Sequence, residues 1–268
     1  MRYMIFGDVH GNLVALDAVL AAAQRLGVDA YLFVGDVVGY GPEPLECIKR
    51  LLSFQQDGRL AWVVGNHELV VRGELDSQGY NEEARQTLAW TQQLLESTPW
   101  AQEFIASGKL TEQVNDLIWL AHDSLATPSN GHYHRYPQNA KSELACLRYQ
   151  NGRVCFYGHT HKMRGEVLRD DGSVVLVPMD VVEPDSADPG PLRLRAKEFG
   201  WIGAGSAGFP VNEKRQPEFL ILDDAVVDDW KIEKYAVTYP RQEARERALR
   251  VLGETCSAAV AERVMRWL

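Results

Sequence analysis

The sequence predicts an α/β fold, and three of its features support that prediction. β-forming runs alternate with helical patterns in the N-terminal part, which is typical of a largely parallel sheet with helices packed on it. Almost every predicted strand there ends in a glycine that is followed by Asp or Asn. Further along, shorter β-rich runs with hairpin signals predict a second, more antiparallel sheet that faces the first.

The N-terminal elements follow one another as strand, loop and helix. Each predicted strand is a short β-rich run that stops at a glycine, and each helix carries apolar residues at helical spacing. Pro99 marks either the end of the last helix or the start of another. In order, we expect a strand over residues 2–6, a helix over 12–25, a strand over 30–34, a helix over 44–54, a strand over 60–64 and a helix over 81–95.

The C-terminal half is richer in short β-runs. The segments Asp170-Asp171-Gly172 and Asp223-Asp224 have the composition of hairpin turns, and residues 183–191, rich in Pro and Asp, are expected to form an exposed loop. Pro240 introduces a charged, Ala- and Leu-rich helix that continues through Leu268. The strands assigned to the second sheet span residues 116–121, 153–157, 173–177 and 219–222.

Length, composition and charge favour one compact, acidic domain. With 268 residues, 46% of them apolar, the chain can bury one substantial core. We therefore expect a single domain over residues 1–268, with 241–268 as a C-terminal helical segment packed on it. The 28 Lys and Arg residues against 37 Asp and Glu give a net charge of −9, which argues against a general nucleic-acid or anionic-membrane binder.

Sequence features of export, of membrane insertion and of thiol chemistry are missing. The apolar run before Asp8 is too short for a secretory signal, and no stretch approaches the roughly 20 apolar residues of a membrane helix. We therefore expect a cytoplasmic protein. The four cysteines lie far apart without a CxxC pair, so neither a thiolate zinc site nor a redox motif is indicated.

Metal-competent side chains at the strand ends form the most informative pattern. They occur in Gly7-Asp8-Val9-His10, Gly35-Asp36, Gly65-Asn66-His67 and Gly158-His159-Thr160-His161. The glycine lets the chain turn sharply, and the polar residue after it projects into the crevice at the carboxyl ends of the strands. Carboxylates together with imidazoles suit Mn, Fe or Zn, and a bridging Asp is what a pair of adjacent cations requires.

Isolated polar residues have a plainer interpretation. A lone His beside a strand is more often a hydrogen-bonded loop residue than a ligand, and we interpret Asp123, His132 and His134 in that way. Four metal-competent segments in order, each after an apolar run, are not explained by turn chemistry alone. The arginines that could contact phosphate, or could equally be solvated surface residues, are Arg72, Arg135 and Arg164.

The motifs GDVHGN, GDVVGYGP, GNHE and GHTH, together with His122, resemble those of the calcineurin-like metallophosphoesterase superfamily. The resemblance covers nearly the whole chain and is closest to a microbial, single-domain, phosphodiesterase-like subgroup. It implies a four-layer α/β/β/α sandwich of two mixed sheets, with the site between the ends of the sheets. The segments that favour this subgroup are Gly39-Tyr40-Gly41-Pro42, Asn81 with Trp90-Thr91, and Gly205-Ser206-Ala207-Gly208.

The resemblance also implies a ligand set and a mechanism. Two divalent metal ions would make a bridging hydroxide available as nucleophile, with His67 beside them as the general acid. Mn is favoured as the metal, with Fe, Zn, Ni and Mg as alternatives. The sequence departs from the subgroup at two places, where Asp rather than Gly follows His122 and Ala204 rather than Pro precedes Gly205. Carried over by motif, one ion takes Asp8, His10 and His161, the other takes Asn66, His122 and His159, and Asp36 bridges them.

The loop after Asp36 favours small substrates. Protein phosphatases and their diadenosine-tetraphosphate-cleaving relatives typically carry an arginine there, in a GDxxxRG pattern, whereas this chain has Tyr40 at that place. We expect a phosphodiesterase or a small-molecule or nucleotide phosphatase, which binds neither nucleic acid nor membrane; the oligomeric state is left open. The alternatives are a dinucleoside-polyphosphate hydrolase or protein phosphatase of the same superfamily, a nuclease, and a metal-binding scaffold without catalysis.

Overall fold

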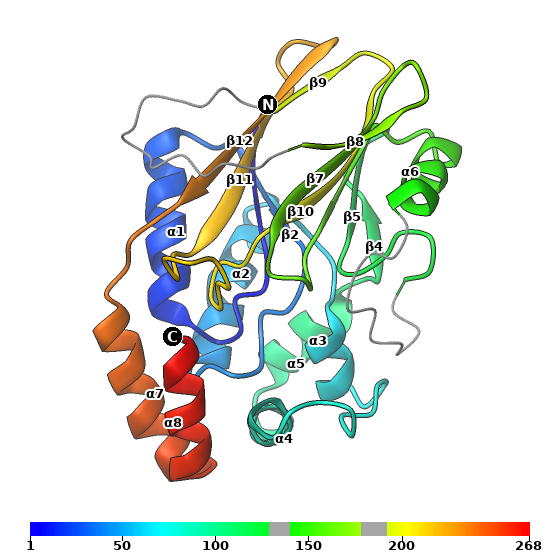
Figure 1. The fold of residues 1–268 in the computed structure, drawn as a ribbon. Helices are drawn as coiled ribbons and strands as arrows, with labels where there is room; N and C mark the ends of the chain where they lie inside the picture. The colour runs from blue at the N-terminus through cyan, green and yellow to red at the C-terminus, as the bar shows by residue number, and fades with distance from the viewer. Residues whose placement is uncertain (129–139, 178–191) are drawn as a thin grey trace.

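Two β-sheets packed face to face form the centre of the molecule, and helices cover their outer faces (Figure 1). The structure is a computed structural model that describes residues 1–128, 140–177 and 192–268. The expected loop over 183–191 therefore lies outside the described residues. The arrangement is the four-layer α/β/β/α sandwich of two mixed sheets that the sequence motifs implied, and that prediction is confirmed.

The first sheet has a parallel and an antiparallel half. Its three N-terminal strands run parallel to one another, and three later strands add to the free edge of the first strand in antiparallel pairings. In spatial order the strands are β3 (Leu60–Trp62), β2 (Ala30–Phe33), β1 (Arg2–Phe6), β11 (Glu218–Asp223), β12 (Asp229–Ala236) and β9 (Leu192–Arg195).

The second sheet has the same mixture of pairings. Its three central strands are parallel, and antiparallel strands flank them on both sides. In spatial order the strands are β4 (Thr111–Gln113), β5 (Ile118–Ala121), β6 (Val154–Tyr157), β10 (Phe199–Ala204), β7 (Met163–Leu168) and β8 (Val174–Val177).

Two expectations about the sheets are wrong. Among the described residues each sheet has two parallel and three antiparallel pairings, so the second is not the more antiparallel one. Residues 219–222 belong to β11 of the first sheet, where Leu220 pairs with Ile5 of β1. The local β-pattern shows that a strand forms, but hydrogen bonds to a strand far away in the chain decide which sheet it joins.

The side chains of β1 alternate between the two faces of the first sheet, and this alternation shows how the layers are built. Tyr3 and Ile5 face the second sheet and contribute to the core between the sheets, whereas Met4 and Phe6 face the helices on the outer side. The side chain of Trp201 on β10 points away from the first sheet and packs with Leu144 under the helix that covers the second sheet. Successive side chains of a strand point to opposite faces, so a strand that is buried on both faces, such as β1, is apolar at consecutive positions.

Eight helices surround the sheets in the described part of the chain. Residues 66–71 and 140–149 form helices that the pattern did not indicate, and Pro99 starts a new helix. The C-terminal region is not one helix, because Ser257 accepts a hydrogen bond from the N–H of Val260 and begins a second one. The helices are α1 (Leu13–Leu26), α2 (Pro44–Gln56), α3 (Asn66–Val71), α4 (Glu82–Glu96), α5 (Pro99–Ser107), α6 (Ala140–Tyr149), α7 (Arg241–Thr255) and α8 (Ala258–Trp267).

The two C-terminal helices pack on the rest of the fold. Leu252 of α7 and Val264 of α8 are fully buried, in a cluster that also contains Val14 of α1 and Phe209 of the loop after β10. Among the described residues, none of the helices has the length and apolar character needed to span a lipid bilayer.

A direct contact joins the two sheets at their carboxyl ends. The loop after β10 hydrogen-bonds to the loop after β1, because the N–H of Gly208 and the hydroxyl of Ser206 both donate to the carbonyl oxygen of Asp8, at 3.1 and 2.8 Å. A Cβ atom at Gly208 would lie 1.8 Å from the carbonyl oxygen of Val9, so only glycine allows this approach.

We predict that Gly208→Ala lowers the free energy of unfolding by about 1–3 kcal/mol, because the added methyl group forces the two loops apart. Gly253→Ala in α7 is the matched control, since a Cβ atom at this position would meet nothing within 4 Å and alanine is the better helix former. We expect this second variant to gain about 0.5–1 kcal/mol. Urea unfolding of the two variants measures both values, and equal stabilities would contradict the packing described for Gly208.

Candidate metal centre

The residues that the motifs single out meet at one end of the two sheets. Each follows the carboxyl end of a strand, so the loops of both sheets reach the same place even though they are far apart in the chain. The side chains are buried or nearly so. The set contains Asp8 and His10 after β1, Asp36 after β2, Asn66 and His67 after β3, His122 after β5, and His159 and His161 after β6.

The backbone at these positions has an unusual conformation. Nine residues other than glycine have positive φ in the described part of the chain, and five of them belong to the predicted ligand set. Such a conformation costs on the order of 1–3 kcal/mol per residue and is found mainly at functional sites. The five are Asp8, His10, Asp36, His159 and His161, with φ between 50° and 62°.

The glycines of the motifs act mainly by making room. A Cβ atom at Gly65 would lie 2.1 Å from Oδ1 of Asp36, and one at Gly158 would lie 2.6 Å from Oδ2 of Asp8. Neither glycine has positive φ, so the expectation that glycine makes the turn is wrong at these two positions. The acidic side chains can reach the centre because the strand ends beside them carry no side chain.

Glu68 holds two of these loops together. Its buried carboxylate accepts hydrogen bonds from the backbone N–H groups of Asp36, Val37, Val38 and Gly65, at 2.7, 2.9, 3.1 and 2.8 Å. Burial raises the pKa of Glu68 to about 7. The sequence analysis gave this residue no role, although a Glu three residues after the Gly that precedes a helix has the spacing of a capping box.

Backbone carbonyls orient three of the imidazoles. Each ring has its Nδ1 atom within hydrogen-bond distance of a carbonyl oxygen, and an N–H donated there leaves the lone pair on Nε2, which faces the centre. Metal-binding histidines are usually held in this way. The pairs are His10 with Val38 at 3.1 Å, His122 with Val34 at 2.6 Å, and His161 with Phe209 at 2.8 Å.

Asp8, His10 and His161 form the first group of possible ligands. Nε2 of His161 lies 3.3 Å from Oδ1 of Asp8 and 3.0 Å from Nε2 of His10, and the three ligand atoms lie within 4.8 Å of one another. The second carboxylate oxygen of Asp8 is buried and has no hydrogen-bond partner among the residues that the structure describes. A buried oxygen without a donor is costly, so this atom fits a bound cation.

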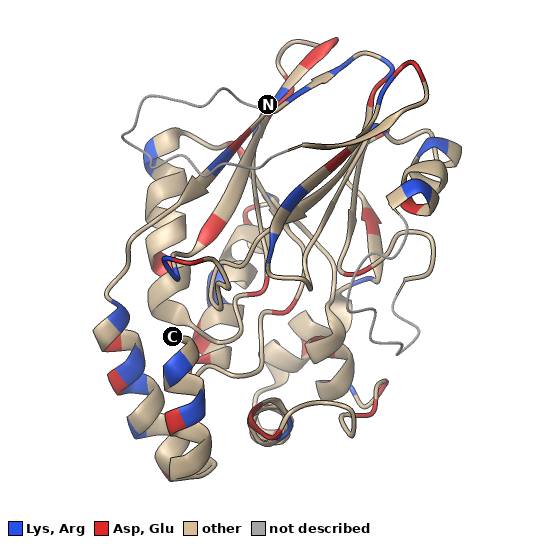
Figure 2. Ribbon diagram, viewed as in Figure 1, with Lys and Arg blue, Asp and Glu red and all other residues tan. Residues whose placement is uncertain are grey.

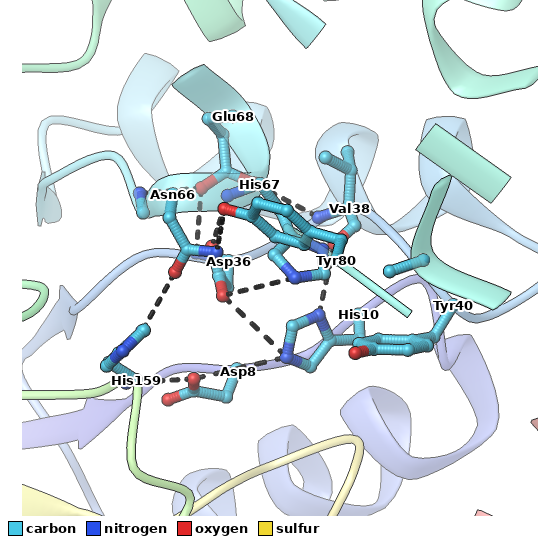
Figure 3. Close-up of polar contacts among 12 residues, drawn as sticks. Asp8, His10, Asp36, Val38, Tyr40, Asn66, His67, Glu68, Tyr80 and His159 are labelled. Atoms are coloured by element: carbon cyan, nitrogen blue, oxygen red, sulfur yellow. Dashed lines mark hydrogen bonds and ion pairs between the residues drawn. The ribbon is translucent and has the colours of Figure 1, made fainter. Parts of the chain in front are cut away.

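Asn66, His122 and His159 form the second group of possible ligands, and Figure 3 shows Asn66 beside His159. Oδ1 of Asn66 lies 3.1 Å from Nε2 of His122 and 2.8 Å from Nδ1 of His159. At the other end of the amide, Nδ2 donates to the hydroxyl oxygen of Tyr80 at 2.7 Å.

The Asp36 carboxylate lies between the two groups. Its Oδ2 atom is 3.3 Å from Nε2 of His122 and 3.8 Å from Nε2 of His10, while Oδ1 accepts the backbone N–H of His67 at 3.0 Å. The imidazole of His67 lies next to it, with Nε2 4.0 Å from Oδ2 of Asp36. By distance alone, His67 could also join His10 and Asp36 around an ion.

The loop after His122 is held in an unexpected way. The buried carboxylate of Glu143, on α6, accepts hydrogen bonds from the hydroxyl of Ser124 at 2.6 Å and from the backbone N–H groups of Leu125 and Ala126 at 2.8 and 3.0 Å. His122 therefore lies in the centre even though the glycine that usually follows it is replaced here by Asp.

Burial and neighbouring charges shift the pKa values in the centre. Burial lowers the pKa of His159 to about 3 and that of His161 to about 4, and it raises the pKa of Asp8 well above its usual value. For His122, burial opposes protonation, but the adjacent Asp36 carboxylate outweighs it and raises the pKa to about 10.

This donor set fits divalent cations. Metal ions bind deprotonated carboxylates and neutral imidazoles, so cations bound here would compete with protons for these groups. Mixed carboxylate, amide and imidazole ligands suit Mn, Fe or Zn.

The other polar candidates of the sequence have structural roles or fall outside the described residues. Arg72 donates to the carbonyl oxygens of Ile105 and Gly108, and Arg164 pairs with Glu166, so both are engaged elsewhere. The remaining candidates, His132, His134 and Arg135, lie outside the described residues. Asp123 accepts the backbone N–H of Ser124 at 2.8 Å, as a loop residue would.

A cavity of about 430 Å³ opens beside the centre. The rings of Tyr40 and Tyr80 both lie near His67, with centroids 5.2 and 5.6 Å from its ring. No Lys or Arg is found among the described residues that line the cavity. The lining consists of Asp36, Tyr40, Asn66, His67, Gly79, Tyr80, Asn81, His159 and His161.

Comparison with known proteins identifies relatives of the chain in sequence and in fold. An uncharacterised protein of Methanocaldococcus jannaschii is 25% identical over 249 residues, which cover 92% of this chain and 91% of that protein. Phosphodiesterase YfcE of Escherichia coli is 25% identical over 193 residues, which cover 66% of this chain and 81% of that protein. A metallophosphoesterase structure from Sphaerobacter thermophilus has the same fold, with 24% identity, coverage of 100% and 99% of the two chains, and a TM-score of 0.71.

The sequence model of the calcineurin-like phosphoesterases matches residues 1–163, which is more than half of the chain and includes the loops after β1, β2, β3, β5 and β6. These loops carry the whole candidate centre. The chain is therefore a metal-dependent phosphoester hydrolase that belongs to the calcineurin-like phosphoesterase family.

Proposed function

We propose that this protein hydrolyses small phosphate esters, either as a phosphodiesterase or as a small-molecule or nucleotide phosphatase, with two divalent metal ions. The observation that carries the proposal is the convergence of two groups of possible ligands on either side of one carboxylate, that of Asp36. Two sites that share a carboxylate are what a pair of adjacent cations needs.

The ligands proposed for each ion follow from the two groups. Asp8, His10 and His161 would hold one ion, the group around Asn66 would hold the other, and Asp36 would contact both. Ions bound there supply Lewis-acid stabilisation of the phosphoryl oxygens and make hydroxide available near neutral pH. The carbonyl oxygens that face His10, His122 and His161 keep these rings in the tautomer that ligation requires.

His67 is proposed as the proton donor to the leaving group. It lines the cavity and lies beside Asp36, so its imidazole is within reach of an ester bound there. Burial lowers the pKa of His67, whereas an anionic phosphate group next to the ring would raise it again. The proton on the ring would then be transferred to the departing oxygen.

Cavity and surface favour a small substrate. A volume of about 430 Å³ suits a small molecule, and its described lining offers no cationic side chain for a polyphosphate. In the part of the chain that Figure 2 colours by charge, basic residues are interspersed with acidic ones, most densely along α7 and α8. A nuclease would be expected to show a continuous basic track instead.

Mn is the metal that we propose first, with Fe, Zn, Ni and Mg as alternatives, because the donor set mixes oxygen with imidazole nitrogen. The cytoplasmic location stays a prediction.

Metal-depleted protein is expected to hydrolyse neither the mono- nor the diester of p-nitrophenol, and to regain activity when Mn, Fe, Zn, Ni or Mg is added singly. We expect the largest recovery with Mn and a higher kcat/KM for the diester. Release of p-nitrophenol, measured by its absorbance, checks both expectations.

Diadenosine tetraphosphate is assayed in parallel as a second substrate. A preference for it would favour the dinucleoside-polyphosphate alternative, and activity without metal would overturn the proposal.

His67→Ala should lower kcat by ~10²- to 10⁴-fold for esters with poor leaving groups and much less for p-nitrophenyl esters, whose leaving group needs no proton. The measurement is kcat across a series of esters with different leaving-group pKa values. Metal content should stay the same, as measured by mass spectrometry. Equal losses across the series would rule out the acid role.

Asp36→Asn should weaken binding of both ions, because the amide removes the negative charge that offsets their mutual repulsion. The loss should exceed the ~10- to 100-fold that is typical when an outer-shell partner is removed. Asp17→Asn is the matched control, since Asp17 lies on α1 and pairs with Arg50 at the surface. Calorimetric titration with Mn measures both variants. Two tightly bound ions in Asp36→Asn would show that the bridging assignment is wrong.

A further inference from the structure

Asn66 carries the only amide among the proposed ligands, and the two ends of that amide are chemically different. Its oxygen can bind a cation, whereas its NH₂ group carries two donors and cannot. The ligand group around Asn66 therefore depends on the direction in which this amide points. The side chain is almost fully buried, so its donors also need acceptors within the protein.

The two histidines beside Asn66 cannot hydrogen-bond to its amide oxygen once they bind a cation. Nε2 of His122 and Nδ1 of His159 both face Oδ1 of Asn66. A ring nitrogen that binds a cation has no proton to donate, so neither contact remains a hydrogen bond in that state. For His122 the remaining N–H is already directed at the carbonyl oxygen of Val34.

Tyr80 contacts the opposite end of the amide. Its hydroxyl oxygen accepts a hydrogen bond from Nδ2 of Asn66 at 2.7 Å. Oδ1 is left to face His122 and His159, and Figure 3 shows Asn66 with Tyr80 and His159. This bond is compatible with a bound cation. It satisfies the buried NH₂ group and also increases the electron density on the amide oxygen, as outer-shell partners of metal ligands do.

The chain holds Tyr80 firmly in this place. The residue lies in the segment between α3 and α4, where its N–H donates to the carbonyl oxygen of Ser77 at 3.0 Å. The next residue, Asn81, caps α4 by accepting the N–H of Ala84 at 2.9 Å. The ring edge of Tyr80 also packs near His67, at a centroid distance of 5.6 Å and an angle of 70°.

We propose that Tyr80 is a positioning residue that holds the Asn66 amide with its oxygen towards the second metal site and thereby sets the affinity of that site. The inference rests on the proposed function, because it assumes that Asn66, His122 and His159 bind an ion. Tyr80 lies outside the loops that follow the strands, and it is not one of the residues in the family motifs.

The test is calorimetric titration of the metal-free protein with Mn²⁺ alone. For the unmodified chain we expect two binding events. Tyr80→Phe keeps the ring but removes the acceptor, and we expect it to weaken one event by ~10- to 100-fold and to leave the other unchanged. If both events keep their affinities, the proposal is overturned; if both weaken equally and the thermal midpoint falls, Tyr80 has a general structural role and the proposal also fails.

Tyr157→Phe is the matched control. Tyr157 is buried in β6, two residues before His159, and within the described part of the chain its hydroxyl has no hydrogen-bond partner. Tyr157→Phe therefore removes a phenol hydroxyl, as Tyr80→Phe does, but this hydroxyl accepts no hydrogen bond from a metal-binding side chain. Both Mn²⁺ affinities should therefore stay as in the unmodified chain, and a loss like that of Tyr80→Phe would overturn the assignment.

A double-mutant cycle with Asn66→Ala tests the mechanism. Alanine leaves no amide for the Tyr80 hydroxyl to hold, so Tyr80→Phe should not weaken Mn²⁺ binding further in the Asn66→Ala background. Equal losses in both backgrounds would show that the Tyr80 hydroxyl acts independently of the amide, and would overturn the proposal.

The same titration separates this inference from the proposed function. If the unmodified chain binds no Mn²⁺ or only one ion, the two-metal proposal itself is wrong. If it binds two ions and only the Tyr80 comparison fails, the two-metal proposal survives without the positioning role.

Discussion

Four backbone N–H groups from two loops converge on the buried carboxylate of Glu68, and the candidate centre depends on this interaction. A buried carboxylate is costly unless donors surround it. Here the donors come from Asp36, Val37, Val38 and Gly65, so the carboxylate is satisfied only when the loops after β2 and β3 lie together. The place of Asp36 is thus determined by a residue that does not itself face the cavity.

The same principle recurs at other parts of the centre. Glu143 organises the loop after His122, and the carbonyl oxygen of Phe209 holds the ring of His161. In each case a buried polar group that needs a partner connects segments that are distant in the chain. Five residues of the centre have positive φ, which is energetically unfavourable, and these surrounding contacts offset that cost. The five are Asp8, His10, Asp36, His159 and His161.

Charge balance explains why such a centre is suited to cations. Burial raises the pKa of Asp8, and Asp36 raises that of His122 to about 10. Divalent ions would compete with protons for these groups, and a bound ion would offer the substrate phosphate a positive charge that the described cavity lining lacks. An acidic protein can in this way still attract an anionic substrate.

The α/β class, the strands that end in metal-competent side chains and the chemical nature of those side chains follow from the sequence alone, because hydrophobic period and glycine placement are local signals. The three-dimensional structure was needed to show that residues 219–222 join the first sheet and that a second C-terminal helix begins at Ser257. It was also needed to show that Glu68 and Tyr80 hydrogen-bond to residues of the candidate centre. These features depend on hydrogen bonds between residues distant in sequence, and no local pattern specifies the partner of such a bond.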